Sequence, residues 1–492
     1  MSVIDVQDLT FSYDGGAREI FSHVSFRLDT DWKLGLVGRN GRGKTTFLRL
    51  LTGQYEYRGT IAAGVDFTYF PFDVTDPHRA TGVILQDVCP GAEDWEILRE
   101  LSYLQTDAAV LDRPFDTLSG GERTKVLLAG LFLQPGSFLL IDEPTNHLDT
   151  AGRQIVSAYL RRKKGFILVS HDRAFLDGCV DHILSINKKN IEIQSGTFSS
   201  WLENFGRQQA YEATQNERLQ KDVARLTEAS KRTAAWADRT EASKYGKAAS
   251  GLKQDRGRVG HKAAKLMKHA KVTEARQQQA IEQKSQLLQN TETSERLKLF
   301  PLVCRSERVL ACNDVQILYD GRPAGRPARF ALMRGERIAL DGKNGCGKSS
   351  LLKLILGADV PHAGTLSLAS GLIVSYVPQT TDGLSGRLSA FAAANRLDES
   401  LFMAMLRKLD FPVSDLGSDI AALSQGQKKK VLLAKSLCEQ AHLYVWDEPL
   451  NYIDIYSRLQ IETLLREAQP TMLFVEHDKA FRDAVATQVV EL

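Results

Sequence analysis

Two glycine-rich turns have the residue spacing of a phosphate-binding loop. "GRNGRGKTT" begins at Gly38 and "GKNGCGKSS" begins at Gly342, and each follows an apolar strand. Glycines let backbone N–H groups close around phosphate oxygens, and the helix N-terminus behind them favours negative charge. We expect Lys44 and Lys348 to reach the β- and γ-phosphates of a nucleotide. The nucleotide-binding residues predicted in these loops are Gly38, Asn40, Gly41, Gly43, Lys44, Thr45, Thr46, Gly342, Asn344, Gly345, Gly347, Lys348, Ser349 and Ser350.

A pair of adjacent carboxylates follows a short apolar run in each half of the chain. "LLIDEP" ends in Asp142 and Glu143 before its proline, and "YVWDEP" ends in Asp447 and Glu448. The first acid of each pair suits Mg²⁺, and the second suits polarisation of an attacking water. Acid pairs are common on protein surfaces, but their position directly after a strand favours the catalytic interpretation. With the loop hydroxyls, the predicted Mg²⁺ ligands are Thr45, Asp142, Ser349 and Asp447.

A histidine ends the next apolar strand of each half, where an imidazole can reach the γ-phosphate. These residues are His171 in "LVSHD" and His477 in "FVEHD". A lone histidine would more often be an ordinary core or surface residue. Repetition in register favours the catalytic interpretation here.

Four motifs recur at a nearly constant distance. The offsets are 304 (Lys44 to Lys348), 305 (Ser119 to Ser424), 305 (Asp142 to Asp447) and 306 (His171 to His477). Chance would not keep four motifs in register over such a distance, so the chain is a tandem duplication with an insert.

The order of elements predicts an α/β nucleotide-binding domain in each half. "SFLLID" and "GFILVS" are continuous apolar runs, as expected of parallel strands buried on both faces. We place the first domain at residues 1–205 and the second at 300–492. Residues 206–299 form the insert, for which sparse apolar residues at helical spacing predict an antiparallel helical hairpin with a glycine-rich tip at about 245–260.

The insert concentrates positive charge. Residues 206–300 hold 20 Lys and Arg against 11 Asp and Glu, whereas the whole chain has a net charge of only +3. A basic hairpin binds phosphate backbones without reading sequence, and structured RNA offers grooves and splayed bases to a protruding loop. The alternative is a solvated helical spacer. The candidate RNA-binding residues are Lys244, Tyr245, Lys247, Leu252, Lys253, Arg256, Arg258, Lys262, Lys265 and Lys268.

Composition is that of a globular protein of two or three domains. The chain has 492 residues, more than one hydrophobic core normally supports. No apolar run approaches the length of a membrane span, and the N-terminus does not resemble a secretory signal. The 6 cysteines are far apart, without a C-x-x-C pair, which favours reduced thiols and a cytoplasmic location.

With these motifs, the chain resembles the ATP-binding-cassette (ABC) superfamily over nearly all of both halves. "LSGGE" at Leu118 and "LSQGQ" at Leu423 look like its signature motif. The resemblance implies that the halves face each other head to tail with two ATP molecules between them. It implies that the first loop pairs with Ser424 and Gly426 and the second with Ser119 and Gly121. It also implies that Tyr13 and Tyr319 stack on adenine; the alternative is an ordinary strand tyrosine.

Two departures from the family pattern predict that the two ATP sites are unequal. "YVPQ" supplies Gln379, a Mg²⁺ ligand implied by the resemblance, whereas the first half reads "YFPF" and has Phe72 there. The second signature carries Gln425 in place of its first glycine.

Tandem cassettes joined by a basic helical insert resemble the ABC-F subfamily, and the motifs are most similar to those of the Lsa-type ribosome protection proteins. The resemblance implies a partner, the 70S ribosome at its tRNA exit site, with contacts to 23S rRNA and peptidyl-tRNA. It implies that ATP closes the halves, that the insert dislodges lincosamides, pleuromutilins or streptogramin A, and that hydrolysis releases the protein.

Two other functions stay open from the sequence. One is an ABC-F translation factor that acts on stalled ribosomes without a drug. The other is the soluble ATPase subunit of an efflux transporter, for which the chain encodes no membrane domain.

Overall fold

The computed structural model describes residues 2–13, 19–72, 74–146, 148–187, 191–211, 296–319, 321–343 and 345–492, with seven positions between 214 and 228. Two compact units are present: Met1–Trp201 with Ser294–Leu492, and Leu202–Thr293. Both predicted ATP-binding domains belong to the first unit. Residues 198–211 are helical. Asn344, the predicted hairpin tip and all ten candidate RNA-binding residues lie outside the described residues.

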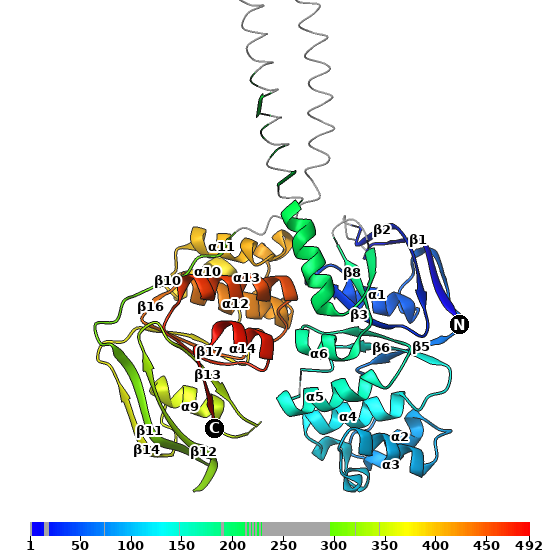
Figure 1. Cartoon of the computed structure of the whole chain (residues 1–492), viewed down its shortest axis with the longest axis horizontal. Coiled ribbons are helices and arrows are strands. Elements are labelled where there is room, and N and C mark those ends of the chain that lie inside the picture. The colour runs from blue at the N-terminus through cyan, green and yellow to red at the C-terminus, as the bar shows by residue number, and fades with distance from the viewer. Residues whose placement is uncertain are drawn as a thin grey trace, which may run out of the picture. The chain divides into compact units, whose positions relative to one another are not determined.

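The first half contains a mixed sheet and an antiparallel sheet (Figure 1). The mixed sheet is parallel except at its last strand, in the order β5 (Asp66–Phe70), β6 (Ser137–Asp142), β7 (Phe166–Val169), β3 (Lys33–Gly38), β8 (His182–Ile186) and β9 (Ile191–Ser195). The antiparallel sheet has the order β2 (Phe21–Asp29), β1 (Val3–Phe11) and β4 (Arg58–Ala62). The helices of the first half are α1 (Lys44–Leu51), α2 (Thr81–Val88), α3 (Asp94–Tyr103), α4 (Gly120–Leu131), α5 (Thr150–Arg161) and α6 (Arg173–Cys179), with 3₁₀ helices η1 (Ala108–Asp112) and η2 (Phe115–Thr117).

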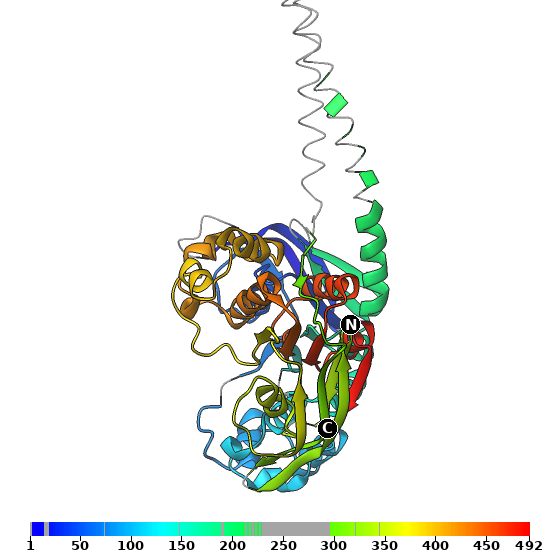
Figure 2. The same ribbon diagram turned by 90° about the vertical axis from the view of Figure 1, so that its left-hand side faces the viewer.

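The second half repeats this plan. Its parallel sheet has the order β15 (Val374–Val377), β17 (Leu443–Asp447), β18 (Met472–Val475), β13 (Arg337–Asp341) and β19 (Gln488–Glu491). The antiparallel sheet has the order β12 (Arg322–Met333), β11 (Arg308–Tyr319) and β14 (His362–Leu368), and in Figure 2 its colour runs from green in β11 and β12 toward yellow in β14. β10 (Phe300–Pro301) pairs with β16 (Gln440–Ala441). The helices of the second half are α9 (Lys348–Ile355), α10 (Leu388–Ala394), α11 (Glu399–Lys408), α12 (Gln425–Cys438), α13 (Ile455–Ala468) and α14 (Lys479–Val485), with 3₁₀ helices η4 (Val413–Gly417) and η5 (Ile420–Ala422).

The central strands are buried on both faces, as their apolar runs predict. All four residues of β7 and all four of β18 are buried. Burial of each such side chain contributes about 1.5–3 kcal/mol. The structure confirms the α/β fold class of both halves.

The carboxyl ends of adjacent parallel strands bring the predicted motifs together. β7 lies between β3 and β6 in the first half, so the loop after Gly38, the acids at Asp142 and the turn to His171 share one sheet edge. β18 lies between β13 and β17 in the second half, with the same consequence.

Candidate ATP-binding and hydrolysis sites

The first glycine-rich loop joins β3 to α1 and is shaped around a lysine. Gly43 has φ 90°, and a Cβ there would come within 2.5 Å of Ile20, so only glycine fits. The Lys44 ammonium donates to the carbonyl oxygens of Gly38 at 2.7 Å and Arg39 at 3.3 Å. Burial lowers the pKa of Lys44. The loop is therefore already folded around the charge that is predicted to contact phosphate.

The second loop, between β13 and α9, has the same geometry. Gly347 has φ 97°, and Lys348 donates to the carbonyl oxygens of Gly342 at 2.7 Å and Lys343 at 3.0 Å. The duplication has thus preserved the backbone of both loops.

At the first site, the carboxylates lie beside the loop hydroxyl. Thr45 Oγ1 donates to Asp142 Oδ2 at 2.9 Å, and Tyr69 OH donates to the same oxygen at 2.9 Å. Glu143 has φ 50°, and its Oε1 lies 3.3 Å from His171 Nε2. Tyr69 was not predicted from the sequence, because it reaches the site from β5 through strand pairing with β6.

At the second site, Glu448 has more hydrogen-bond partners. Its Oε1 lies 3.4 Å from His477 Nε2, and its Oε2 accepts from Asn451 Nδ2 at 2.6 Å. Burial would raise the pKa of Glu448, but hydrogen bonds with His477, Gln379 and Asn451 outweigh burial and lower the pKa to about 2. Ser349 hydrogen-bonds to Asp447, which is buried.

The equivalent glutamate of the first site lies in a different electrostatic environment. Burial and the neighbouring Asp142 raise the pKa of Glu143 to about 8. Phe72, at the position of Gln379, has no amide to offer. The structure therefore places the same pair of residue types, Glu and His, in two unequal settings.

The first site is completed by residues of the second half. Asn40 Nδ2 donates to the carbonyl oxygen of Tyr452 at 2.8 Å. Gly426 lies against this contact, since a Cβ there would come within 2.7 Å of the Tyr452 oxygen and 3.2 Å of Asn40 Nδ2. The first ATP cavity, about 270 Å³, is lined by loop residues, Asp142, Glu143, His171, Gly426 and Tyr452. Tyr452 was not predicted from the sequence, because it contributes a backbone carbonyl oxygen to the site of the other half.

The second ATP cavity, about 350 Å³, also draws on both halves. Gly347, Lys348, Ser349, Gln379, Glu448 and His477 line it together with Gly120, Asn146 and Arg153. The signature glycine that lines it is Gly120, whereas the predicted Gly121 is the next residue of α4. The hydroxyls of Ser119 and Ser424 accept from the N–H groups of Glu122 and Gln427, each at 3.3 Å, and so cap α4 and α12.

The two predicted adenine-stacking tyrosines lie beside the loops. Tyr13 OH is 2.7 Å from Thr46 Oγ1, and Tyr319 OH is 2.6 Å from Ser350 Oγ. Tyr13 is 44% exposed and Tyr319 46% exposed, as an adenine-stacking role requires.

A buried lysine supports the loop that carries Gln379. Lys429 is 1% exposed, and its ammonium donates to the carbonyl oxygens of Pro378 at 2.7 Å and Gln379 at 2.9 Å. Burial lowers the pKa of Lys429 to about 8. The unusual Gln425 accepts a hydrogen bond from Thr381 in the same loop. The first half has Thr124 at the position of Lys429, so it lacks this support.

Comparison with known proteins agrees with this geometry. The family described as ABC transporter matches residues 21–146 and 326–451. The ATP-binding protein Uup of Caulobacter vibrioides is 29% identical over 497 residues, which cover 97% of this chain and 75% of that one. The ribosome protection protein VmlR of Bacillus subtilis is 27% identical over 484 residues, 96% of this chain and 83% of that one. The energy-dependent translational throttle protein EttA of Mycobacterium tuberculosis is 26% identical over 527 residues, 96% of this chain and 89% of that one.

A solved structure shares the fold. The complex of archaeal ribosomal stalk protein aP1 and archaeal ribosome recycling factor aABCE1 matches with a TM-score of 0.62 and 20% identity, over 98% of this chain and 87% of that one. Among the residues that the structure describes, no helix combines the length and apolarity needed to cross a membrane. The two family matches cover more than half of the chain, which therefore belongs to the ABC transporter family and, by its tandem domains and its relatives, is an ATPase of the ABC-F subfamily.

Proposed function

We propose that this chain is an ATP-dependent ribosome-binding protein that dislodges antibiotics from the peptidyl-transferase centre through its interdomain insert. Its relatives include a ribosome protection protein that matches 96% of the chain. The insert carries the charge that a ribosomal RNA partner requires: residues 206–300 have 20 basic against 11 acidic side chains. The drugs concerned are lincosamides, pleuromutilins and streptogramin A, and the contacts are 23S rRNA and peptidyl-tRNA at the tRNA exit site.

One observation carries the mechanism. Asn40 Nδ2 donates to Tyr452 O at 2.8 Å beside Gly426, so a nucleotide in the first cavity contacts both halves. A ligand that binds both halves favours their closed arrangement by its differential affinity. ATP thus closes the halves, and loss of the γ-phosphate reopens them.

The oxygen donors of both sites fit Mg²⁺. Thr45 with Asp142, and Ser349 with Asp447, place a hydroxyl beside a carboxylate, which is the ligand chemistry that Mg²⁺ prefers. Asp447 Oδ1 is buried without a hydrogen-bond partner among the described residues, as expected of an oxygen reserved for a cation. Gln379 lines the same cavity. When bound, Mg²⁺ neutralises charge on the β- and γ-phosphates.

Hydrolysis follows from the side chains around the γ-phosphate position. Glu448 orients the attacking water and accepts its proton as the bond from the γ-phosphorus to the ADP oxygen breaks. His477, 3.4 Å away, holds that carboxylate in place, and Lys348 offsets the negative charge of the phosphates. The products are ADP and inorganic phosphate.

A second function has its own support. The relative EttA is named a translational throttle protein, which favours an ABC-F translation factor that acts on ribosomes without a drug. Minimum inhibitory concentrations with and without expression separate the two functions, because only drug displacement raises them.

The test uses Glu143→Gln with Glu448→Gln, which leave ATP binding intact and block hydrolysis. We expect this double variant to co-sediment with 70S ribosomes in ATP and not in ADP. Neutralisation of the insert's lysines and arginines is expected to abolish co-sedimentation and drug protection. Protection from drugs that survives this neutralisation would contradict the proposal.

A further inference from the structure

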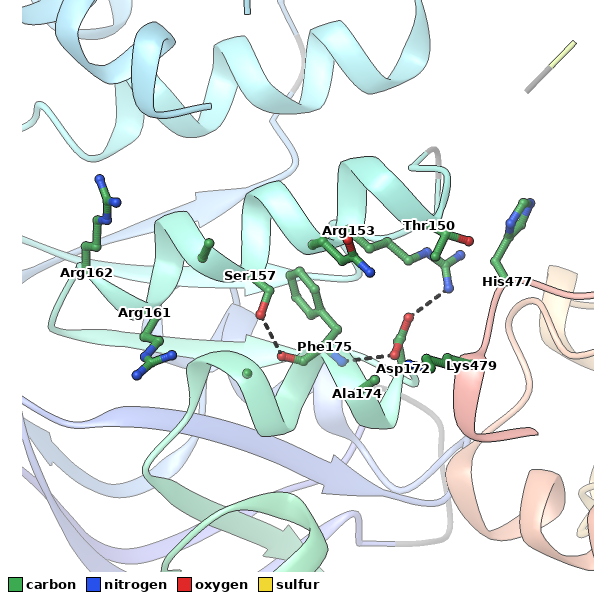
Figure 3. A pocket seen from close by; sticks show the side chains of 13 residues that line it. Thr150, Arg153, Ser157, Arg161, Arg162, Asp172, Ala174, Phe175, His477 and Lys479 are labelled. Atoms are coloured by element: carbon green, nitrogen blue, oxygen red, sulfur yellow. Dashed lines mark hydrogen bonds and ion pairs between the residues drawn. The ribbon is translucent and has the colours of Figure 1, made fainter. Parts of the chain in front are cut away.

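A cavity of about 580 Å³ adjoins the second ATP cavity, with which it shares two lining residues. It is formed by α5 and α6 of the first half together with His477 and Lys479 of the second (Figure 3). We call it the rear cavity. His477 and Arg153 line both the rear cavity and the second ATP cavity, so these two residues lie between the γ-phosphate position and the rear cavity.

The charged residues that line the rear cavity are mostly basic. Its basic residues are Arg153, Arg161, Arg162 and Lys479. The one acid in its lining, Asp172, is paired with Arg153 at 2.8 Å. Arg161 and Lys479 make no ion pair with any residue that the structure describes. The lining therefore keeps an excess of positive charge that a small anion would satisfy.

Two buried polar atoms of the rear cavity also lack a partner. Thr150 Oγ1 and His477 Nδ1 have no hydrogen-bond partner among the described residues. The His477 side chain is only 7% exposed. A buried polar atom without a partner is destabilising, so each is expected to have a use. A hydroxyl, an imidazole, guanidinium groups and an ammonium together form a donor-rich lining suited to an oxyanion.

The duplication supplies an internal comparison, because an ion pair occupies the corresponding place behind the first site. At offsets of 305 and 306, Ser157 corresponds to Glu462 and Lys479 to Arg173. Arg173 Nη2 lies 2.5 Å from Glu462 Oε2, and both side chains are largely buried. The second site thus has a serine and an unpaired lysine where the first has a buried ion pair.

We propose that the rear cavity takes the inorganic phosphate produced at the second site and is its exit route. HPO₄²⁻ formed beside Glu448 passes His477 and Arg153, is held by Thr150 and Lys479, and leaves past the exposed Arg161 and Arg162. This route lets phosphate depart while ADP still covers the front of the site. The ion pair of Arg173 and Glu462 blocks the equivalent route at the first site.

The binding test uses the Glu143→Gln, Glu448→Gln protein with both sites loaded with ATP, so that both γ-phosphate positions are occupied. Titration with inorganic phosphate, followed by ³¹P NMR, is expected to show one saturable site. Ser157→Glu, which copies the first site's acid, and Lys479→Gln should each weaken binding at least tenfold. Glu462→Ser, the matched change behind the first site, frees Arg173 and should leave the affinity of the rear cavity unchanged, so any phosphate bound beside Arg173 is counted as a second, separate site. The proposal would be overturned if phosphate showed no saturable binding, or if neither Ser157→Glu nor Lys479→Gln weakened it.

The kinetic test asks whether bound phosphate is the product of hydrolysis. In a Glu143→Gln background, rapid quench reports cleavage, and a fluorescent phosphate-binding protein reports release. We expect Ser157→Glu and Lys479→Gln to slow release about fivefold or more with cleavage unchanged. Unchanged release would show that the cavity takes phosphate only from solution, and equal slowing of both steps would show a structural effect. Either result rules out the exit route.

Discussion

The two candidate ATP sites share the backbone of their glycine-rich loops but differ around the glutamate that is proposed to be catalytic. Lys44 and Lys348 make the same 2.7 Å bond to the first glycine of their loops, and both glutamates lie 3.3–3.4 Å from a histidine. Only Glu448 also accepts from Asn451 and Gln379, which keeps it ionised. The two candidate sites therefore share the groups proposed to bind phosphate and differ in the groups proposed for hydrolysis, and we propose that the second site cleaves ATP faster.

The largest expected effect comes from removing each glutamate in turn. We expect Glu448→Gln to lower the ATPase kcat by about 10²–10³-fold, because it removes the ionised general base. Glu143→Gln should lower kcat less than about tenfold. Steady-state phosphate production measures both, and equal losses would show that the two sites work alike.

Lys429 offers the next test. Lys429→Thr, which copies Thr124, removes two hydrogen bonds to the backbone that carries Gln379. We expect about a tenfold fall in kcat in the Glu143→Gln background, with ATP affinity nearly unchanged. The neighbouring Lys428→Thr is the matched control and should have little effect. Loss of ATP binding in parallel with kcat would instead indicate a general structural role.

The smallest expected effect is a gain at the first site. Phe72→Gln supplies the amide found at Gln379, and we expect turnover in the Glu448→Gln background to rise about two- to fivefold. The gain is limited because burial and Asp142 still raise the pKa of Glu143. An increase to the level of the second site would mean that the missing amide alone causes the asymmetry.

Much of both sites was predictable because their residues are consecutive in the chain. The loops around Lys44 and Lys348, the acid pairs and the two histidines follow strands whose apolar runs mark them. Tyr69, Tyr452 and Lys429 were not predictable, because each reaches its site through pairing or packing of a separate element. The signature serines show another limit: the motif is visible, but the use of the Ser119 and Ser424 hydroxyls as helix caps depends on local geometry.

The insert differs from the ATP sites in its strong positive charge. Its positive charge follows directly from its composition, and the spacing of its apolar residues predicts a helical hairpin. The tip of that hairpin lies outside the described residues. The contacts proposed for Lys244–Lys268 therefore stay predictions, which the neutralised insert tests.

The most direct test combines the two sites with the proposed partner. Ribosome co-sedimentation in ATP should be measured for Glu143→Gln, Glu448→Gln and the double variant. We expect Glu448→Gln alone to trap the ribosome complex nearly as well as the double variant, and Glu143→Gln to release it. Equal trapping by both single variants, or none by the double variant, would contradict an ATPase whose second site times its release from the ribosome.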